Sequence, residues 1–286
     1  MMDRQRSLLQ VVKPLRQGTY QFLCLFIGLV IMSPLLYAIS ISFMRPEEIL
    51  TVDLNLLPRS FFLGNYQIAI EQTMIFRFIL NSFIVAFGSS VIRVVMASLA
   101  AFSFAFFEYK GKKLLFYLVV ISMIIPSDLL LVQNFFTVAQ LGLVNTYLGI
   151  MIVFFINAMS IFIMRQRFMT YSMSLREAAM VDGCGNFKFF AQILLPSNTP
   201  VLATVFIVSF VGVWNTFLWP LIVTNVNEMR TAQMAITMLN IAEGSASYGP
   251  GTVMAAAVII LIPSIAVFII FQKRIVGGLM TGAVKG

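Results

Sequence analysis

The chain has 286 residues, of which 60% are hydrophobic and only 10% are charged, and its net charge is +8. A soluble domain carries about 25% charged residues, so this composition excludes an ordinary soluble protein and indicates an integral membrane protein. The chain contains no histidine, which excludes histidine general bases, histidine-ligated metals and Ser-His-Asp triads.

Six apolar blocks in the chain are each long enough to cross the hydrocarbon core of a bilayer, which takes about 20 helical residues. We expect helices, because an exposed strand edge finds no hydrogen-bond partner in lipid. The sequence therefore predicts an all-α integral membrane fold with six transmembrane helices. The blocks cover residues 21–43, 83–107 (with a start somewhat before residue 83), 114–132, 144–164, 201–223 and 253–271.

The distribution of lysine and arginine indicates how these helices are oriented, because cytoplasmic segments of membrane proteins are enriched in both. With the N-terminus in the cytoplasm, 14 of the 19 basic residues fall in inside segments, and four (Arg45, Arg59, Arg77 and Arg230) fall outside. Both termini are therefore predicted to be cytoplasmic, and topology explains the positive charge better than a nucleic-acid surface. The resulting boundaries are a cytoplasmic N-terminus at 1–20, a first transmembrane helix at 21–43, an extracytoplasmic loop at 44–75, a core of five helices at 76–274 and a cytoplasmic tail at 275–286.

The largest inside loop, residues 165–200, contains the amphipathic stretch EAAMVDGCGNFKFFAQILLP at residues 177–196. Ser174 and Glu177 have the spacing of a capping box, in which each side chain bonds the backbone N–H of the other residue at a helix start. Gly183 can adopt a positive φ and end that helix. A first short helix is therefore predicted at the beginning of this stretch.

A second short helix is predicted after the glycine. Gly185 is a further stop residue, Asn186 can cap the helix FKFFAQILL, and Pro196 ends it. The unit is therefore helix, glycine break, helix, and its apolar residues need a partner surface. An ordinary loop between two spans would not need such a pair of helices.

The spacing in this loop is E-A-A, three residues, Gly183, nine residues, Ile193, one residue and Leu195-Pro196. The pattern resembles the EAA loop of permease subunits in binding-protein-dependent, ATP-driven importers of bacteria. In that family the first helix of the loop is the coupling helix, which sits in a cleft of the ATPase subunit. The resemblance implies that the ATPase-coupling residues are Ser174, Glu177, Ala178, Ala179, Asp182, Gly183, Gly185 and Pro196.

Five further segments resemble the carbohydrate-uptake branch of this family, and specifically the second permease of the pair in maltose-type and glycerol-3-phosphate-type systems. The resemblance covers the chain from about Asn81 to its end, whereas the first 80 residues match only in layout. The segments are NSFIVAFGSSVIRVVMASLAAFSFAFF (81–107), KGKKLLF (110–116), LGLVNTYLGI (141–150), VGVWNTFLWPLIV (211–223) and IVGGLMTGAVKG (275–286).

The resemblance implies that the chain is a multi-pass protein of the bacterial cell membrane with four partners: a second homologous permease subunit, two ATPase subunits and an extracytoplasmic solute-binding protein. The chain itself would be no enzyme and would bind no cofactor, because ATP and Mg²⁺ belong to the ATPase. In agreement, the sequence contains no GxxxxGK[ST] phosphate loop. The resemblance also implies an ATPase-facing tail that ends in Lys285 and Gly286.

The transported solute is expected to be a sugar or a sugar-like molecule. Glycerol 3-phosphate or a related phosphodiester is the alternative within the same architecture. The rival class is a stand-alone secondary carrier, in which the 165–200 loop would be a regulatory platform. Such carriers keep acidic residues within their spans, and no Asp or Glu of this chain falls near a predicted bilayer midplane.

Candidate residues for the translocation pathway lie in the second and fifth blocks. Arg93 falls in the middle of its block, where a charged side chain is costly and has to face protein or water. It is either satisfied by serines and carbonyls of a neighbouring helix, or it is a pathway residue that contacts an anionic solute. Trp214, Asn215 and Phe217 offer aromatic faces and an amide to sugar hydroxyls, with helix packing as the other interpretation.

Overall fold

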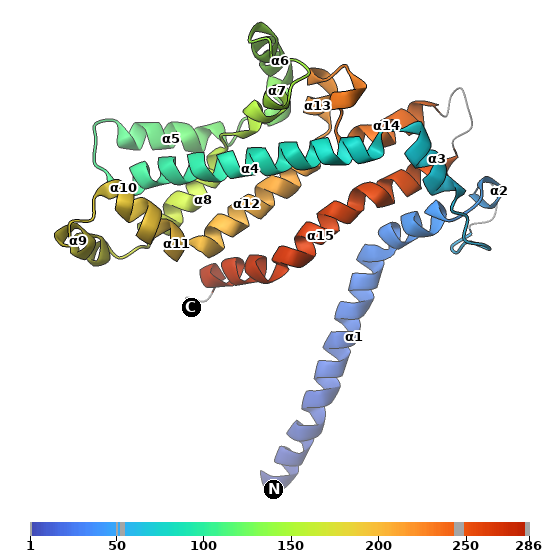
Figure 1. The fold of residues 1–286 in the computed structure, drawn as a ribbon. Coiled ribbons are helices and arrows are strands. Elements are labelled where there is room, and N and C mark those ends of the chain that lie inside the picture. The colour runs from blue at the N-terminus through green and yellow to red at the C-terminus, as the bar shows by residue number, and fades with distance from the viewer. Residues whose placement is uncertain (1, 50, 52–54, 243–248, 284–286) are drawn as a thin grey trace. The chain divides into compact units, whose positions relative to one another are not determined.

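The computed structural model is helical in all the secondary structure that it describes, which confirms the predicted all-α fold class (Figure 1). The chain divides into two compact units, Met1–Gln72 with Leu239–Val258 and Thr73–Met238 with Ile259–Gly286. The residues that the structure describes are 2–49, 51, 55–242 and 249–283.

A buried asparagine fastens the turn after the first long helix of the first unit. The side chain of Asn65 donates to the backbone oxygens of Ser42 at 3.0 Å and of Met44 at 2.7 Å. The predicted extracytoplasmic loop, residues 44–75, therefore contains folded helical segments. The helices of this unit are α1 (Met2–Ser42), α2 (Pro46–Ile49), α3 (Gly64–Gln72) and the first part of α15 (Pro250–Ala283).

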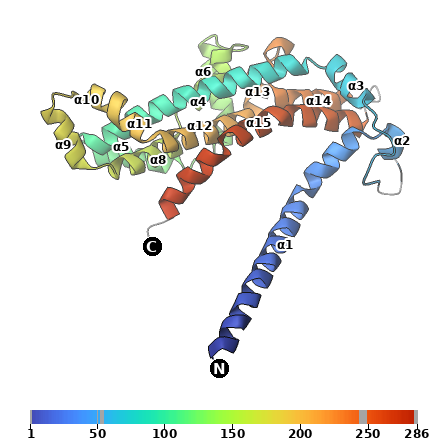
Figure 2. The ribbon, with the colours of Figure 1, turned by 60° about the horizontal axis from the view of Figure 1, so that its bottom comes forward.

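The second unit is organised around α4 (Ile75–Phe106), an unbroken helix of 32 residues. Its neighbours in both views are α8 (Ala158–Met169) and α12 (Thr199–Trp214) (Figure 1 and Figure 2). The other elements are α5 (Lys112–Ser122), the 3₁₀ helix η1 (Ser127–Leu130), α6 (Leu131–Gln140), α7 (Tyr147–Met151), the 3₁₀ helix η2 (Ile152–Phe154), α9 (Met173–Val181), α10 (Asn186–Lys188), the π-helix η3 (Phe189–Leu194), α11 (Leu195–Ser197), α13 (Leu218–Val223), the 3₁₀ helix η4 (Asn227–Met229) and α14 (Ala232–Ala242).

Small residues make up much of the buried face of α4. Ala86 and Ala101 are fully buried, and so are Ser89 and Ser90. Small side chains let neighbouring helix backbones approach closely, which is how helices associate in lipid, where no hydrophobic effect drives them together. The composition of α4 thus suits its central position between α8 and α12.

Three helices are long and apolar enough to cross a membrane by themselves: Gln21–Ser42, Ile75–Phe106 and Pro250–Val267. Three further pairs of helices qualify only as pairs, because each pair is bent. The described residues therefore contain three unbroken candidate spans, or up to six if each bent pair is one span. The bends are 95° between Lys112–Ser122 and Ser127–Gln140, 51° between Tyr147–Phe154 and Ala158–Met169, and 78° between Asn186–Ser197 and Thr199–Trp214.

Three of the predicted blocks contain a break, so the prediction of one continuous helix in each of them is wrong. Pro126, which has no N–H to donate, follows the end of α5. Asn157 starts α8 anew, because its side chain accepts from the N–H of Ser160 at 2.9 Å. Residues 215–217 separate α12 from α13. The blocks concerned are 114–132, 144–164 and 201–223.

Aromatic rings fix the EAA loop to the end of α4. Phe102 and Phe106 of α4 lie against Phe189 and Phe190 of η3, with ring centroids between 5.0 and 6.4 Å apart. All four rings are buried. Such contacts add to the burial of the rings, so the second helix of the loop finds its predicted partner surface within its own chain.

Candidate functional site

The start of α9, the helix that carries the E-A-A residues, differs from the predicted capping box. Ser172 occupies the N-cap position with an extended backbone, so Ser174 already lies inside the first turn. The hydroxyls of these two serines bond each other at 2.6 Å, and no side chain caps the helix. The predicted capping box is wrong, because the motif needs the N-cap three positions before Glu177.

Glu177 therefore has no role in starting α9. Its side chain is exposed and makes no hydrogen bond or ion pair within the part of the chain that the structure describes. Ala178 and Asp182 are exposed as well, and Val181 is 87% exposed. The helix thus presents an acidic and apolar surface that is suited to a partner protein.

The end of α9 follows the prediction, because Gly183 stops the helix with a φ of +76°. Its N–H donates to the carbonyl of Met180 at 3.0 Å, and the N–H of Cys184 donates to the carbonyl of Ala179 at 2.9 Å. These are the two bonds of a Schellman motif, which requires a left-handed residue at this position. Gly183 thereby fixes where the exposed helix ends.

The second helix of the loop differs from the prediction at both ends. Gly185 has a φ of −64° and is itself the N-cap, so Asn186 is the first helical residue rather than the cap. Pro196 lies inside α11, and the helix continues past it before the 78° bend into α12. The N–H of Leu195 donates five residues back, to Phe190, so a π-helical register carries the chain past the proline.

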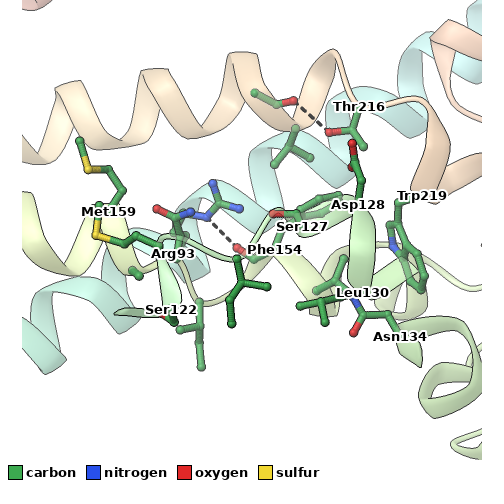
Figure 3. A pocket seen from close by; sticks show the side chains of 18 of the residues that line it. Arg93, Ser122, Ser127, Asp128, Leu130, Asn134, Phe154, Met159, Thr216 and Trp219 are labelled. Carbon is green, nitrogen blue, oxygen red and sulfur yellow. Dashed lines mark hydrogen bonds between the residues drawn. The ribbon is translucent and has the colours of Figure 1, made fainter. Parts of the chain in front are cut away.

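A cavity of about 790 Å³ lies in the second unit, where the broken helices face α4 (Figure 3). Its size falls within the range of small-molecule sites, which is about 300–1,000 Å³. The wall contains charges of both signs, one from Arg93 and one from Asp128. Its uncharged polar residues are Ser122, Ser127, Asn134, Asn157 and Thr216.

Arg93 projects from the middle of α4 into this cavity (Figure 3). Its Nε donates to the backbone oxygen of Phe154 at 2.7 Å, directly before the break that precedes α8. Within the described residues, its two terminal nitrogens make no hydrogen bond. The hydroxyls of Ser89 and Ser90 do not bond it either. The carbonyl that one of the two interpretations expected is present, and the four N–H donors of the two terminal nitrogens remain available to a solute.

The remaining predicted pathway residues divide into one that lines this cavity and two that do not. Phe217 lines it, beside the break after α12. Trp214 is 1% exposed and stacks on Phe210 with centroids 5.8 Å apart, and Asn215 is exposed. The roles of all three in transport remain predictions.

Sequence reasoning missed the other polar residues of this wall, which are Ser122, Ser127, Asp128, Asn134, Asn157 and Thr216. Asp128 follows Pro126 inside an otherwise apolar block, and an acid beside a helix breaker was a signal that could have singled it out. Asn134 and Thr216 gave no such signal, because their sequence neighbours are ordinary for a span. Only the bends of the helices bring them to one cavity.

Trp219 joins α13 to α7, because its buried ring N–H donates to the backbone oxygen of Ile150 at 3.0 Å. We expect Trp219→Phe to lower the melting temperature of the detergent-solubilised protein by several degrees. Leaving a buried carbonyl without its donor costs about 1–3 kcal/mol. Thermal unfolding measures this change when it is followed by the far-ultraviolet circular dichroism of the helices, which does not depend on tryptophan fluorescence.

Trp214→Phe is the matched control for this change. It removes the same atoms from an equally buried indole whose ring nitrogen makes no hydrogen bond among the described residues. An equal loss of melting temperature in both variants would contradict the assigned hydrogen bond.

No group of three or more Cys, Asp or Glu side chains in the described part of the chain could hold a metal ion. The predicted tail is helical as far as Ala283, the end of α15. Lys285 and Gly286, the predicted ATPase-facing residues, lie outside the described residues.

Comparisons with known proteins agree on one kind of relative. A family model described as "Binding-protein-dependent transport system inner membrane component" matches residues 93–280. The sn-glycerol-3-phosphate transport system permease protein UgpE of Brucella melitensis is 30% identical over 267 residues, which are 90% of this chain and 94% of that protein. The arabinooligosaccharides transport system permease protein AraQ of Halalkalibacterium halodurans is 30% identical over 264 residues, which are 91% of this chain and 94% of that protein.

A solved structure shares the fold. It is described as a bacterial ABC transporter involved in the import of the acidic polysaccharide alginate. The TM-score is 0.78 at 22% sequence identity, and the match covers 91% of this chain and 96% of that one.

Proposed function

Since this chain belongs to the binding-protein-dependent transport system inner membrane components, we propose that it forms half of the translocation pathway of a bacterial importer that works by alternating access. The chain is the multi-pass membrane subunit of an ATP-driven importer and is a transport component rather than an enzyme. The observation that carries the proposal is the exposed helix α9, which ends at Gly183 within the E-A-A pattern.

In the proposed mechanism α9 is the coupling helix and contacts an ATPase subunit. Glu177 supplies an acidic group and Val181 an apolar one, and both are available on the surface of the chain. Closure of two ATP-loaded subunits displaces α9, and the cavity around Arg93 changes from facing inward to facing outward. ATP and Mg²⁺ are bound by the ATPase and not by this chain.

The proposed topology has six spans with both termini in the cytoplasm. It is supported by the three unbroken apolar helices, the three bent pairs and the distribution of lysine and arginine. In this topology residues 44–75 and 224–252 lie on the outer side, and the third bent pair counts as a span only from Thr199, because Asn186–Ser197 belongs to the predicted cytoplasmic loop 165–200. The two outer segments would meet an extracytoplasmic solute-binding protein.

The proposed assembly contains this chain, a second homologous permease subunit, two ATPase subunits and the solute-binding protein. The transported solute is proposed to be a sugar or a sugar-like molecule. The relatives support this class, since one is a permease for arabinooligosaccharides. Glycerol 3-phosphate or a related phosphodiester is the second candidate, because another relative belongs to an sn-glycerol-3-phosphate system and Arg93 offers two free donor nitrogens to an anion.

Purification of the chain from native membranes in mild detergent tests the assembly. We expect an ATPase, a second six-helix permease and a solute-binding protein to copurify, and the solute retained by the binding protein identifies the cargo. A chain that purifies alone or only with copies of itself would contradict the proposal and favour the stand-alone carrier.

A further inference from the structure

Arg176 joins three elements at one end of the second unit. It lies on α9, directly before Glu177, but its side chain turns toward the core instead of the exposed surface. One terminal nitrogen donates to the backbone oxygen of Phe106 at 3.2 Å, and the other donates to the side-chain oxygen of Asn186 at 3.2 Å. The guanidinium also lies 5.3 Å from the ring centroid of Phe106 and 5.9 Å from that of Phe107.

The attachment to α4 is a favourable one for a cation. Phe106 is the last residue of α4, and the final carbonyls of a helix have no partner within the helix. The C-terminal end of a helix also carries a partial negative charge, which attracts a guanidinium. The aromatic rings beneath it add a cation–π contribution. Arg176 therefore closes the end of α4 from the neighbouring helix α9.

From Phe106, α4 runs without a break to Arg93 in the cavity and on to Asn81 near its N-terminal end. Arg93 lies 13 residues before Phe106, about 20 Å along the helix at 1.5 Å per residue. Near its first turns, Asn81 donates to the backbone oxygens of Glu228 and Arg230, each at 2.8 Å. Its side-chain oxygen accepts from the hydroxyl of Tyr147 at 2.7 Å.

The covalent route from α9 toward the cavity is less suited to transmit a displacement. It passes through the glycine break, the π-helical η3 and the 78° bend into α12. Each of these features interrupts the regular helical hydrogen-bond pattern, and such interruptions are places where backbone torsion angles can change. The unbroken α4 has no such place between Phe106 and Arg93.

We propose that Arg176 is the positioning residue that makes α9 and α4 move together, so that displacement of α9 reaches Arg93 in the cavity and the segment 228–232 at the far end of α4. This inference rests on the proposed function of α9 as the coupling helix. It assigns the transmission step to a side-chain attachment rather than to the loop backbone.

The test uses the full importer complex, reconstituted in proteoliposomes with the binding protein that copurifies with it. Arg176→Met keeps the apolar length of the side chain and removes the charge and all donors. We expect the ATPase to copurify in normal amount and to hydrolyse ATP at its basal rate. The stimulation of hydrolysis by the loaded binding protein is expected to fall at least about tenfold, and uptake with it.

Two further variants make this test specific. Arg176→Lys keeps the charge but loses the forked geometry, so an intermediate stimulation is expected. Lys188→Gln removes an exposed cation of α10 that makes no hydrogen bond among the described residues, and it is expected to behave like the unaltered chain.

The outcomes separate this inference from the function on which it rests. Normal stimulation and uptake in Arg176→Met would overturn the inference and leave the proposed function intact. Loss of the ATPase from Arg176→Met alone would also overturn it, since Arg176 would then shape the docking surface. Absence of an ATPase from the unaltered complex would contradict the proposed function itself.

Discussion

Glu177→Lys is expected to abolish uptake and to remove the ATPase from the purified complex, while the chain still inserts in the membrane. The side chain is exposed and has no partner among the described residues, so the change leaves the fold of α9 intact. In the proposed interface Glu177 pairs with a cation of the ATPase, and loss of such a buried pair costs about 2–5 kcal/mol, which weakens the contact at least about thirtyfold. Copurification and uptake by the reconstituted importer measure both effects.

Glu108→Lys is the matched control, since it makes the same change of charge on an exposed acid between α4 and α5. The partner of Glu108 is within the chain, because Lys112 donates to it at 2.8 Å. This hydrogen bond and the charge of Lys112 lower the pKa of the Glu108 carboxyl. Uptake is expected to persist in this variant, and equal losses in the two variants would contradict a specific role of Glu177.

Arg93→Met is expected to lower uptake about tenfold or more without loss of the ATPase. The change removes the donor to Phe154 and the cation that lines the cavity, and a lost hydrogen bond to a charged group costs about 1.5–3 kcal/mol. Uptake of the solute that the binding protein retains measures the change, with copurification of the ATPase as a parallel readout. Uptake at the level of the unaltered importer would contradict any role of Arg93 in the pathway.

Arg93→Lys separates the two interpretations of this residue. Lysine keeps the charge, but its ammonium has only three N–H donors on one nitrogen and cannot reproduce the bond from Nε together with the two free terminal nitrogens of the guanidinium. If Arg93 contacts an anionic solute, Arg93→Lys is expected to keep more uptake than Arg93→Met. If Arg93 only holds the backbone at Phe154, both variants lose uptake equally and their melting temperatures fall in parallel.

Composition and hydropathy were sufficient to predict the helical membrane fold, because the cost of unpaired backbone groups in lipid leaves few alternatives. They did not predict where the helices break. Pro126 and Asn157 act through a missing donor and a side-chain cap, which are local effects that an average over 20 residues does not resolve. The same averaging hid the cavity, because its wall combines α4 with three segments of broken helix, and these segments meet only because the helices are broken.

In the E-A-A segment, the end of the helix could be predicted from the sequence, but its start could not. Gly183 was predictable, since a glycine at the end of a helix has one strongly favoured geometry. The start of α9 was not, because Ser172 and Ser174 can both serve as the N-cap and Ser172 occupies that position. Arg176 attracted no attention in the sequence, where it reads as one more basic residue of an inside loop, and its contacts with Phe106 exist only in the folded chain.

The breaks in the helices separate two properties of the chain that evolution can then alter independently. Residues near the breaks, such as Asp128, Phe154 and Phe217, form the cavity wall, whereas Arg176 and the end of α4 lie elsewhere in the unit. Under the proposed function, a substitution at a break is expected to change which molecule fits the cavity without changing the contact between Arg176 and Phe106. The same helices can therefore acquire a different solute specificity by a few changes in the short segments at the breaks. A designer could exchange those segments and keep α9, Arg176 and α4 unchanged.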